Sequence, residues 1–186
     1  MLQPASLLWV DLEMTGLDPA TCAIVEIATL LTGDDLEVVA EGPCLVVHQS
    51  NEILATMSEH VRELHGRSGL LELIRSSSVT LREAEAQVLD FVRQHCAPGQ
   101  ALLCGNSVWQ DRRFLERHMP ELVAYLHYRI IDVSTVKELC RRWYGERGKA
   151  PDKADHHRAL DDIRESIAEL RWYREELFAP PASSML

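Results

Sequence analysis

Two acidic residues stand two positions apart at the end of an apolar run. Asp11 and Glu13 follow Leu7 to Val10, and a turn at Thr15-Gly16 comes directly after them. If the run is a β-strand, its period of two directs both carboxylates to the same face. Like charges this close repel one another unless a cation lies between them. Binding of a divalent metal is therefore one chemistry for this pair, and two solvated acids at a strand end are the alternative.

Three further positions stand out from the general acidity of the chain. Asp111 lies in the first turn of an expected helix, while His157 and Asp162 flank the start of the last expected helix. Carboxylates are the oxygen ligands that Mg²⁺ and Mn²⁺ prefer, and a neutral imidazole can accept a proton from water near neutral pH. The set would suit two-metal hydrolysis of a phosphodiester. Each residue alone has a plainer reading, since an acid in a first helical turn also complements the helix dipole.

The elements that must position these groups follow from periodicity and turn residues. Strands are expected from the first apolar run, from Ile24 to Thr32, from Leu36 to Ala40 and Cys44 to Val47 as a meander, from Ala101 to Cys104, and from Tyr128 to Val133. Helices are expected over 53–64, 70–74, 81–92, 108–118, 134–143 and 159–178. Thr80 with Glu83 and Ser107 with Gln110 are capping-box candidates, and 144–155 is expected to be a mobile loop. The pattern predicts an α/β fold with a mixed five-stranded sheet flanked by helices.

Composition limits the size and the kind of partner. The chain has 186 residues, 46% of them apolar, and a net charge of −10. We expect one domain over residues 1–178 and a disordered tail over 179–186. The negative charge argues against binding long nucleic acid by neutralising many phosphates. Five scattered cysteines predict reduced thiols, and the absence of a signal peptide or an apolar span predicts a cytoplasmic protein without a membrane anchor.

Several separated segments carry a family resemblance. They are Asp11-Leu12-Glu13-Met14-Thr15-Gly16-Leu17-Asp18-Pro19, Cys104-Gly105-Asn106-Ser107 with Gln110-Asp111-Arg112-Arg113-Phe114, Asp132-Val133-Ser134, and His157-Arg158-Ala159-Leu160-Asp161-Asp162. The chain resembles the DEDDh 3′-to-5′ exonucleases from about Leu7 to Tyr173, and within that family the members that act on very short RNA. The resemblance implies a ribonuclease-H-like fold, a homodimer, two Mg²⁺ or Mn²⁺ ions, and release of nucleoside 5′-monophosphates from short RNA oligonucleotides, especially dinucleotides.

The resemblance also implies roles for the residues that match the motifs. His157 would be the general base, and the metal ligands would be Asp11, Glu13, Asp111 and Asp162. Asp162 is the match rather than Asp161, because the last motif of the family places its Asp five residues after the His. The cofactor and the catalytic set predicted from the residue types therefore agree with those implied by the family.

Six more positions match residues that bind the substrate in the family. Leu17 would wedge between two bases, and Ser107, Arg129 and Ser134 would cap the far phosphate and block a longer chain. His65 would support this cap from the partner subunit, and Tyr128 would also reach across. The plainer alternatives are a turn hydrophobe, helix N-caps and a strand aromatic. In one departure, His60 stands where relatives often carry a tryptophan near the bases, which offers a weaker stacking platform.

Three competing functions remain at this point. The same chemistry could act on longer single strands of RNA or DNA. A catalytically silent nucleic-acid-binding domain could keep the fold, although all five chemical positions are filled. A histidine-metal phosphohydrolase built on His156-His157 and Asp161-Asp162 would want more histidine ligands than the chain supplies.

Overall fold

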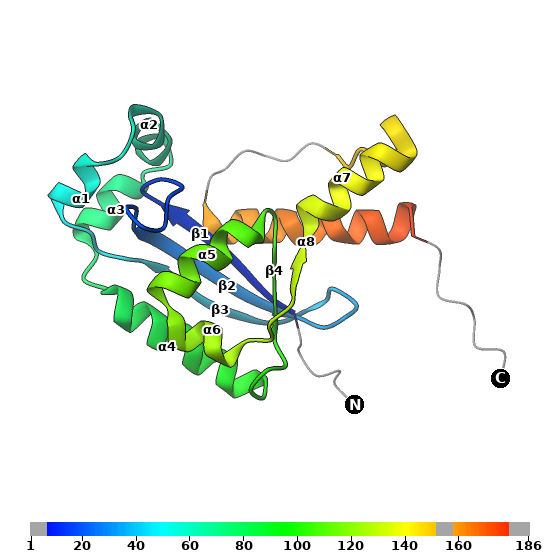
Figure 1. The fold of residues 1–186 in the computed structure, drawn as a ribbon, viewed down its shortest axis with the longest axis horizontal. Coiled ribbons are helices and arrows are strands. Elements are labelled where there is room, and N and C mark those ends of the chain that lie inside the picture. The colour runs from blue at the N-terminus through cyan, green and yellow to red at the C-terminus, as the bar shows by residue number, and fades with distance from the viewer. Residues whose placement is uncertain (1–6, 152–157, 179–186) are drawn as a thin grey trace.

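A mixed sheet of five strands forms the centre of the molecule, in the order β3-β2-β1-β4-β5 (Figure 1). The structure, a computed structural model, describes residues 7–151 and 158–178. The strands are β1 (Leu7–Met14), β2 (Ile24–Thr32), β3 (Val38–Val46), β4 (Leu102–Gly105) and β5 (Ile130–Asp132). β1 pairs antiparallel with β2 and parallel with β4, β2 pairs antiparallel with β3, and β4 pairs parallel with β5. The predicted five-stranded mixed sheet is therefore confirmed.

Helices cover both faces of this sheet. They are α1 (Asn51–Ala55), α2 (Glu59–Arg67), α3 (Leu70–Ser76), α4 (Leu81–His95), α5 (Val108–His118), α6 (Pro120–Tyr125), α7 (Val133–Tyr144), the 3₁₀ helix η1 (Gly145–Gly148) and α8 (Ala159–Glu176). Helices α4, α5 and α6 pack with one apolar cluster of the core, and α7 and α8 pack with the other. In Figure 1 the start of α8 lies beside the carboxyl end of β1.

Side-chain alternation along β1 decides what the end of the strand presents. Leu8, Val10 and Leu12 point into the cluster beneath α4 and α5. Leu7 and Trp9 point to the opposite face, where α8 packs. Since successive side chains alternate, the acids that continue the second series also face α8. The strand therefore aims Asp11 and Glu13 at the helix that carries Asp162.

Some predicted elements differ from the structure. The two short strands at 36–40 and 44–47 are one strand, β3, whose pairing with β2 shifts register twice. Helix α6 was not predicted, and the expected loop from Tyr144 begins with η1. The helix expected over 53–64 is broken, because Ser58 caps a new helix through the Val61 amide. The chain thus turns more often before α4 than its apolar spacing indicates.

Of the two predicted capping boxes, only the first forms. The Thr80 hydroxyl accepts from the Glu83 amide, and the Glu83 carboxylate accepts from the Thr80 amide. Ser107 instead has left-handed backbone angles and no capping bond from its side chain. The Gln110 side chain points elsewhere, to the Leu17 carbonyl. The second capping box was therefore a wrong prediction.

The remaining predictions from composition divide into tested and untested ones. The five cysteines all carry free thiols, as predicted. Within residues 7–151 and 158–178, no helix combines the length and apolar content that crossing a membrane requires. The predicted tail at 179–186 and part of the predicted loop lie outside the described residues.

Candidate active site

Three of the predicted residues come together at one end of the sheet. Asp11 and Glu13 extend from β1, and Asp162 extends from the first turn of α8. Each contributes a carboxylate oxygen, and these oxygens all lie within 4.8 Å of one another. Asp161, the neighbour of Asp162, instead forms an ion pair with Arg164 at 3.6 Å. The helix thus turns one of its two adjacent acids toward the strand and the other toward the surface.

The group is electrostatically costly as it stands. Burial raises the pKa of Asp11 well above its usual value, and the charges of Asp111, Asp162, Glu13 and Glu26 raise it further. Burial, together with the charges of Asp162, Glu26 and Asp111, raises the pKa of Glu13 from 4.5 to about 8. Clustered carboxylates with raised pKa values accept positive charge readily, since a cation removes the repulsion between them. The donor set, oxygen only, fits a hard divalent cation.

Asp111 lies close to this group but makes a different contact. Its side chain is buried, and its Oδ1 accepts a hydrogen bond of 3.0 Å from the backbone amide of Leu12. β4 pairs with β1 only as far as Trp9, so this amide lies past the paired part of the edge and takes its acceptor from α5. Burial raises the pKa of Asp111 to about 7, against the lowering effect of two backbone amides. Asp111 therefore fixes the backbone between Asp11 and Glu13 while adding a fourth carboxylate nearby.

A buried ion pair that the sequence analysis did not identify supports the start of α8. Glu26 lies in β2 opposite Glu13 and is completely buried. Its carboxylate accepts from Arg158 Nη2 at 2.7 Å, from Arg158 Nε at 3.2 Å, and from the Ala159 amide at 3.4 Å. A single acid within the apolar run 24–32 was the signal that could have identified it, because an acid is rarely buried without a partner. This pair anchors the helix end that carries Asp162.

The predicted general base cannot be placed. His157 lies outside the described residues, which resume at Arg158. Because Arg158 is held by Glu26, the residue that follows His157 is fixed close to the acidic group. This is the extent of the geometry around the predicted base.

The predicted phosphate-cap serines lie together at the ends of β4 and β5. Ser107 Oγ and Ser134 Oγ are 3.0 Å apart, and the Ser107 amide donates to Ser134 Oγ at 2.8 Å. Asp132 Oδ1 accepts from the amides of both serines, at 3.0 Å from Ser107 and 2.9 Å from Ser134. The N-cap of α7 is therefore Asp132, and neither serine hydroxyl serves as a helix cap.

Leu17 and the Tyr128-Arg129 pair lie on the surface. Leu17 is 75% exposed, and its carbonyl accepts from Gln110 Nε2 at 2.5 Å. The exposed guanidinium of Arg129 lies 4.9 Å from the centre of the Tyr128 ring. Tyr128 is itself 70% exposed. All three side chains are thus accessible to a ligand or to another protein chain.

His65 lies next to the end of β1. Its side chain is almost fully buried within its own chain. Nε2 lies 2.9 Å from the Met14 carbonyl, and Nδ1 lies 3.8 Å from Glu13 Oε2. The ring therefore lies beside the acidic group of its own subunit, and its predicted support of a partner's phosphate cap stays a prediction.

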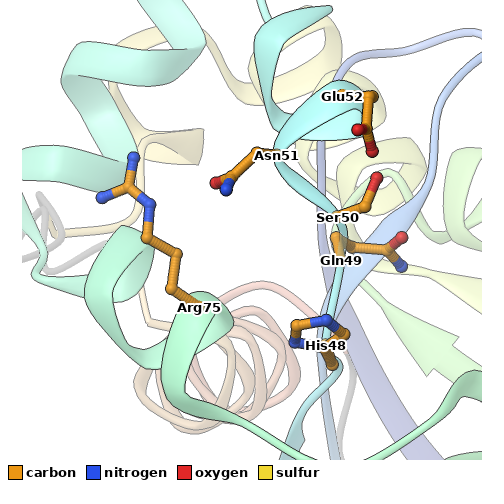
Figure 2. Close-up of a pocket in the computed structure, with 6 residues that line it drawn as sticks. All are labelled: His48, Gln49, Ser50, Asn51, Glu52 and Arg75. Atoms are coloured by element: carbon orange, nitrogen blue, oxygen red, sulfur yellow. The ribbon is translucent and has the colours of Figure 1, made fainter.

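The acidic group is separate from two open surface hollows near α1. One, of about 370 Å³, is lined by His48, Gln49, Ser50, Asn51, Glu52 and Arg75 (Figure 2). The other, of about 530 Å³, shares His48 and Gln49 and extends to His118. Neither is lined by a predicted catalytic residue. The clustering of carboxylates, rather than cavity size, therefore identifies the candidate site.

Comparison with known proteins identifies a family model and several relatives that match the sequence of this chain. The family model RNase_T, described as exonuclease, matches residues 8–170. The chain is 56% identical to "Oligoribonuclease, mitochondrial" of Mus musculus, over 92% of this chain and 73% of that one. It is 54% identical to "Oligoribonuclease" of Halorhodospira halophila, over 95% and 97%, and 53% identical to that of Pseudomonas aeruginosa, over 94% and 97%.

Solved structures agree at the level of the fold. The zinc-bound complex of Escherichia coli ExoI with single-stranded DNA superposes with a TM-score of 0.70 at 14% identity, over 92% of this chain. Exonuclease I from Methylocaldum szegediense gives a TM-score of 0.70 at 17% identity, over 93% of this chain. This chain spans only 41% of each of those longer chains. At such identities the likeness establishes the fold, which is the one the sequence predicted.

Proposed function

The chain belongs to the oligoribonuclease family of exonucleases, and from this premise we propose that it is a metal-dependent 3′-to-5′ exoribonuclease of very short RNA. Its products would be nucleoside 5′-monophosphates, and dinucleotides would be its preferred substrates. The observation that carries the proposal is the convergence of three carboxylates, from β1 and α8, in a chain of this family. Phosphodiester hydrolysis needs charge stabilisation on both the attacking and the leaving oxygen, which such a group is suited to organise.

The proposed cofactors are two divalent ions, Mg²⁺ or Mn²⁺. Bound ions would act as Lewis acids that offset the negative charge developing on the phosphate oxygens. Asp11, Glu13 and Asp162 are the proposed ligands from the clustered group, with Asp111 as the fourth. The raised pKa values of Asp11 and Glu13 support this role, since these carboxylates repel one another in the metal-free chain.

The proton of the attacking water would go to His157. An imidazole with a reference pKa of about 6.5 is neutral over much of the range near pH 7 and can accept it. The Glu26–Arg158 pair supports the proposal, because it fixes the chain immediately after the histidine.

Substrate length would be set at the other end of the site. We assign Leu17 to contact the bases and Ser107, Ser134 and Arg129 to hold the 5′ phosphate. The exposure of Leu17 and the adjacency of the two serines support this assignment. Tyr128, exposed beside Arg129, is the proposed contact with a partner's site in a homodimer, and His65 is proposed to support the phosphate cap of the partner subunit. We further propose a cytoplasmic location.

The test compares substrates of different length. Purified protein with Mn²⁺ is expected to convert a 5′-phosphorylated dinucleotide to monophosphates with a higher kcat/KM than a 20-residue RNA of the same composition. Arg129→Ala should lower the dinucleotide value by about tenfold, through loss of a charge-assisted contact to phosphate. Arg82→Ala removes an exposed arginine at the start of α4, away from the site, and is the control. Equal or better turnover of the long RNA would contradict the preference for short substrates. If neither substrate is turned over, the proposed exoribonuclease activity is wrong.

A further inference from the structure

A chain of hydrogen bonds joins the two serines of the proposed phosphate cap to the helix that carries Asp162. Asn106 lies between them, in the turn that ends β4. Its Oδ1 accepts from Ser134 Oγ at 3.1 Å, and its Nδ2 donates to Ser166 Oγ at 2.9 Å. The Ser166 hydroxyl in turn donates to the Asp162 carbonyl at 2.8 Å. One amide side chain thus bridges the start of α7 and the helix that carries Asp162.

The orientation of this amide follows from its neighbours. Nδ2 also donates to Glu169 Oε2 at 3.0 Å, and Glu169 is buried with Tyr173 donating to its other oxygen. A carboxylate oxygen accepts, so the nitrogen of Asn106 must face Glu169 and the oxygen must face Ser134. The Ser134 proton is therefore committed to Asn106. In the contact between the two hydroxyls, Ser107 is consequently the donor, and its proton is the one that can turn to a ligand anion.

The backbone around Asn106 is held in a demanding conformation. Gly105 packs so closely on β1 that a Cβ there would lie 2.9 Å from the Val10 carbonyl, one residue before Asp11. Ser107 has φ 51° and ψ 30°, left-handed angles that a residue other than glycine rarely adopts. Such conformations persist where surrounding contacts over-determine them, and they concentrate at functional sites. Here the strained turn aims the Ser107 amide at Ser134 and leaves the Asn106 side chain facing α8.

We propose that Asn106 is a positioning residue that fixes the spacing between the Ser107–Ser134 pair and the helix of Asp162, and thereby sets the substrate length that the enzyme prefers. The inference rests on the proposed function and deepens it. With the link intact, the phosphate-binding end and the hydrolytic end of the site form one rigid unit that matches a dinucleotide. Without the link, the two ends still exist but their spacing is no longer fixed.

The experiment measures kcat and KM for a 5′-phosphorylated dinucleotide, for the same dinucleotide without its 5′ phosphate, and for a pentanucleotide. The variants are Asn106→Ala, which removes the amide and all three of its hydrogen bonds, and Ser166→Ala, which removes one of its two contacts with α8 and leaves the one with Glu169. The control is Thr32→Val, which removes a buried hydrogen bond of 3.0 Å from Trp9 Nε1 at the opposite end of the sheet. It shows the effect of losing a buried hydrogen bond far from the link.

The expected result is a rise of about tenfold in KM for the phosphorylated dinucleotide in Asn106→Ala and a smaller rise in Ser166→Ala, with a smaller change in kcat in both. The difference in KM between the dinucleotides with and without the 5′ phosphate should become smaller in these variants. The kcat and KM values for the pentanucleotide should change little. Thr32→Val should lower thermal stability and leave the substrate ratios unchanged. If the wild type itself shows no dinucleotide preference, the proposed function fails. If the wild type prefers the dinucleotide and the link variants keep the same ratio, the role of Asn106 is refuted.

Discussion

Replacing Glu13 by glutamine should make the metal-free protein more stable while it abolishes activity. Glu13 is largely buried beside other acids, and its pKa is raised from 4.5 to about 8. A raised pKa means that the folded chain holds the proton more tightly than the unfolded chain does. The stability gained from protonation is therefore complete below pH 4.5 and is lost as the pH rises toward about 8. Glutamine keeps the shape of the protonated acid and cannot lose that proton.

The gain in the free energy of unfolding depends on how far the pH lies above the pKa that Glu13 has in the unfolded chain. At pH 7 the interval above the unfolded value of 4.5 is about 2.5 pH units, which at 1.36 kcal/mol per unit amounts to about 3 kcal/mol. For a chain of this size, such a gain corresponds to a rise in Tm of roughly 6 to 12 °C. Below pH 4.5 the difference between variant and wild type should vanish. Bound divalent metal should make the wild type more stable than the variant. The metal stabilises the folded wild type, whereas the variant lacks one of the proposed metal ligands.

The assay is thermal unfolding of wild type and Glu13→Gln in EDTA and in Mn²⁺, between pH 4.5 and pH 8. Glu63→Gln is the matched control, because Glu63 is exposed on α2 and outside the acidic group. We expect the curves in EDTA to diverge with rising pH, and the curves in Mn²⁺ to cross. A variant that is no more stable than wild type in EDTA at pH 7 would refute the repulsion argument. A stability gain that is independent of pH would assign the effect to packing instead.

Three other substitutions test the groups around this acid. Arg158→Ala should lower the free energy of unfolding by about 3 kcal/mol in urea titrations, because it leaves Glu26 buried without its partner, and adding Glu26→Gln should recover part of the loss. Asp162→Ala should abolish turnover and the stabilisation by Mn²⁺ in thermal unfolding. His157→Ala should keep that stabilisation and lose about 100-fold or more in kcat, and unchanged turnover at every pH would remove it as the base.

The sequence was sufficient for the sheet because its strands carry strong local signals. The predicted bounds of β2 and α5 match the structure, since β-branched runs and helical spacing are read directly from neighbouring residues. The acidic pair on β1 was predictable for the same reason, as the period of two fixes the face of each side chain. Alternation alone does not predict which helix packs on that face of the sheet. The position of Asp162 depends on how α8 packs on the sheet, and only the motif spacing of the family pointed to it.

Predictions failed where long-range contacts override local preference. Ser107 and Gln110 have the spacing of a capping box, yet Ser134 and Leu17 compete successfully for their polar atoms. Both partners are remote in sequence, so no local pattern contains them. The burial of His65 likewise has no local signal, since it follows from the packing of α2 against the end of β1. Tertiary contacts of this kind concentrate around the site, because the ends of several strands meet there.

The same geometry explains why the fold tolerates so much negative charge in one place. β1 and β2 place Glu13 and Glu26 opposite one another on the face that α8 covers. Arg158 contacts Glu26 directly, with two of its nitrogens on that carboxylate, and its charge lowers the pKa of Glu13 by less than burial and the neighbouring acids raise it. Glu13 is therefore left to repel Asp11 and Asp162, and relief must come from a bound cation. If Arg158 were instead shared among all of these acids, the metal-free chain would be more stable and its affinity for a divalent ion would be weaker. The direct pairing of Glu26 with Arg158 thus leaves the remaining acids as a group whose repulsion a divalent ion would relieve.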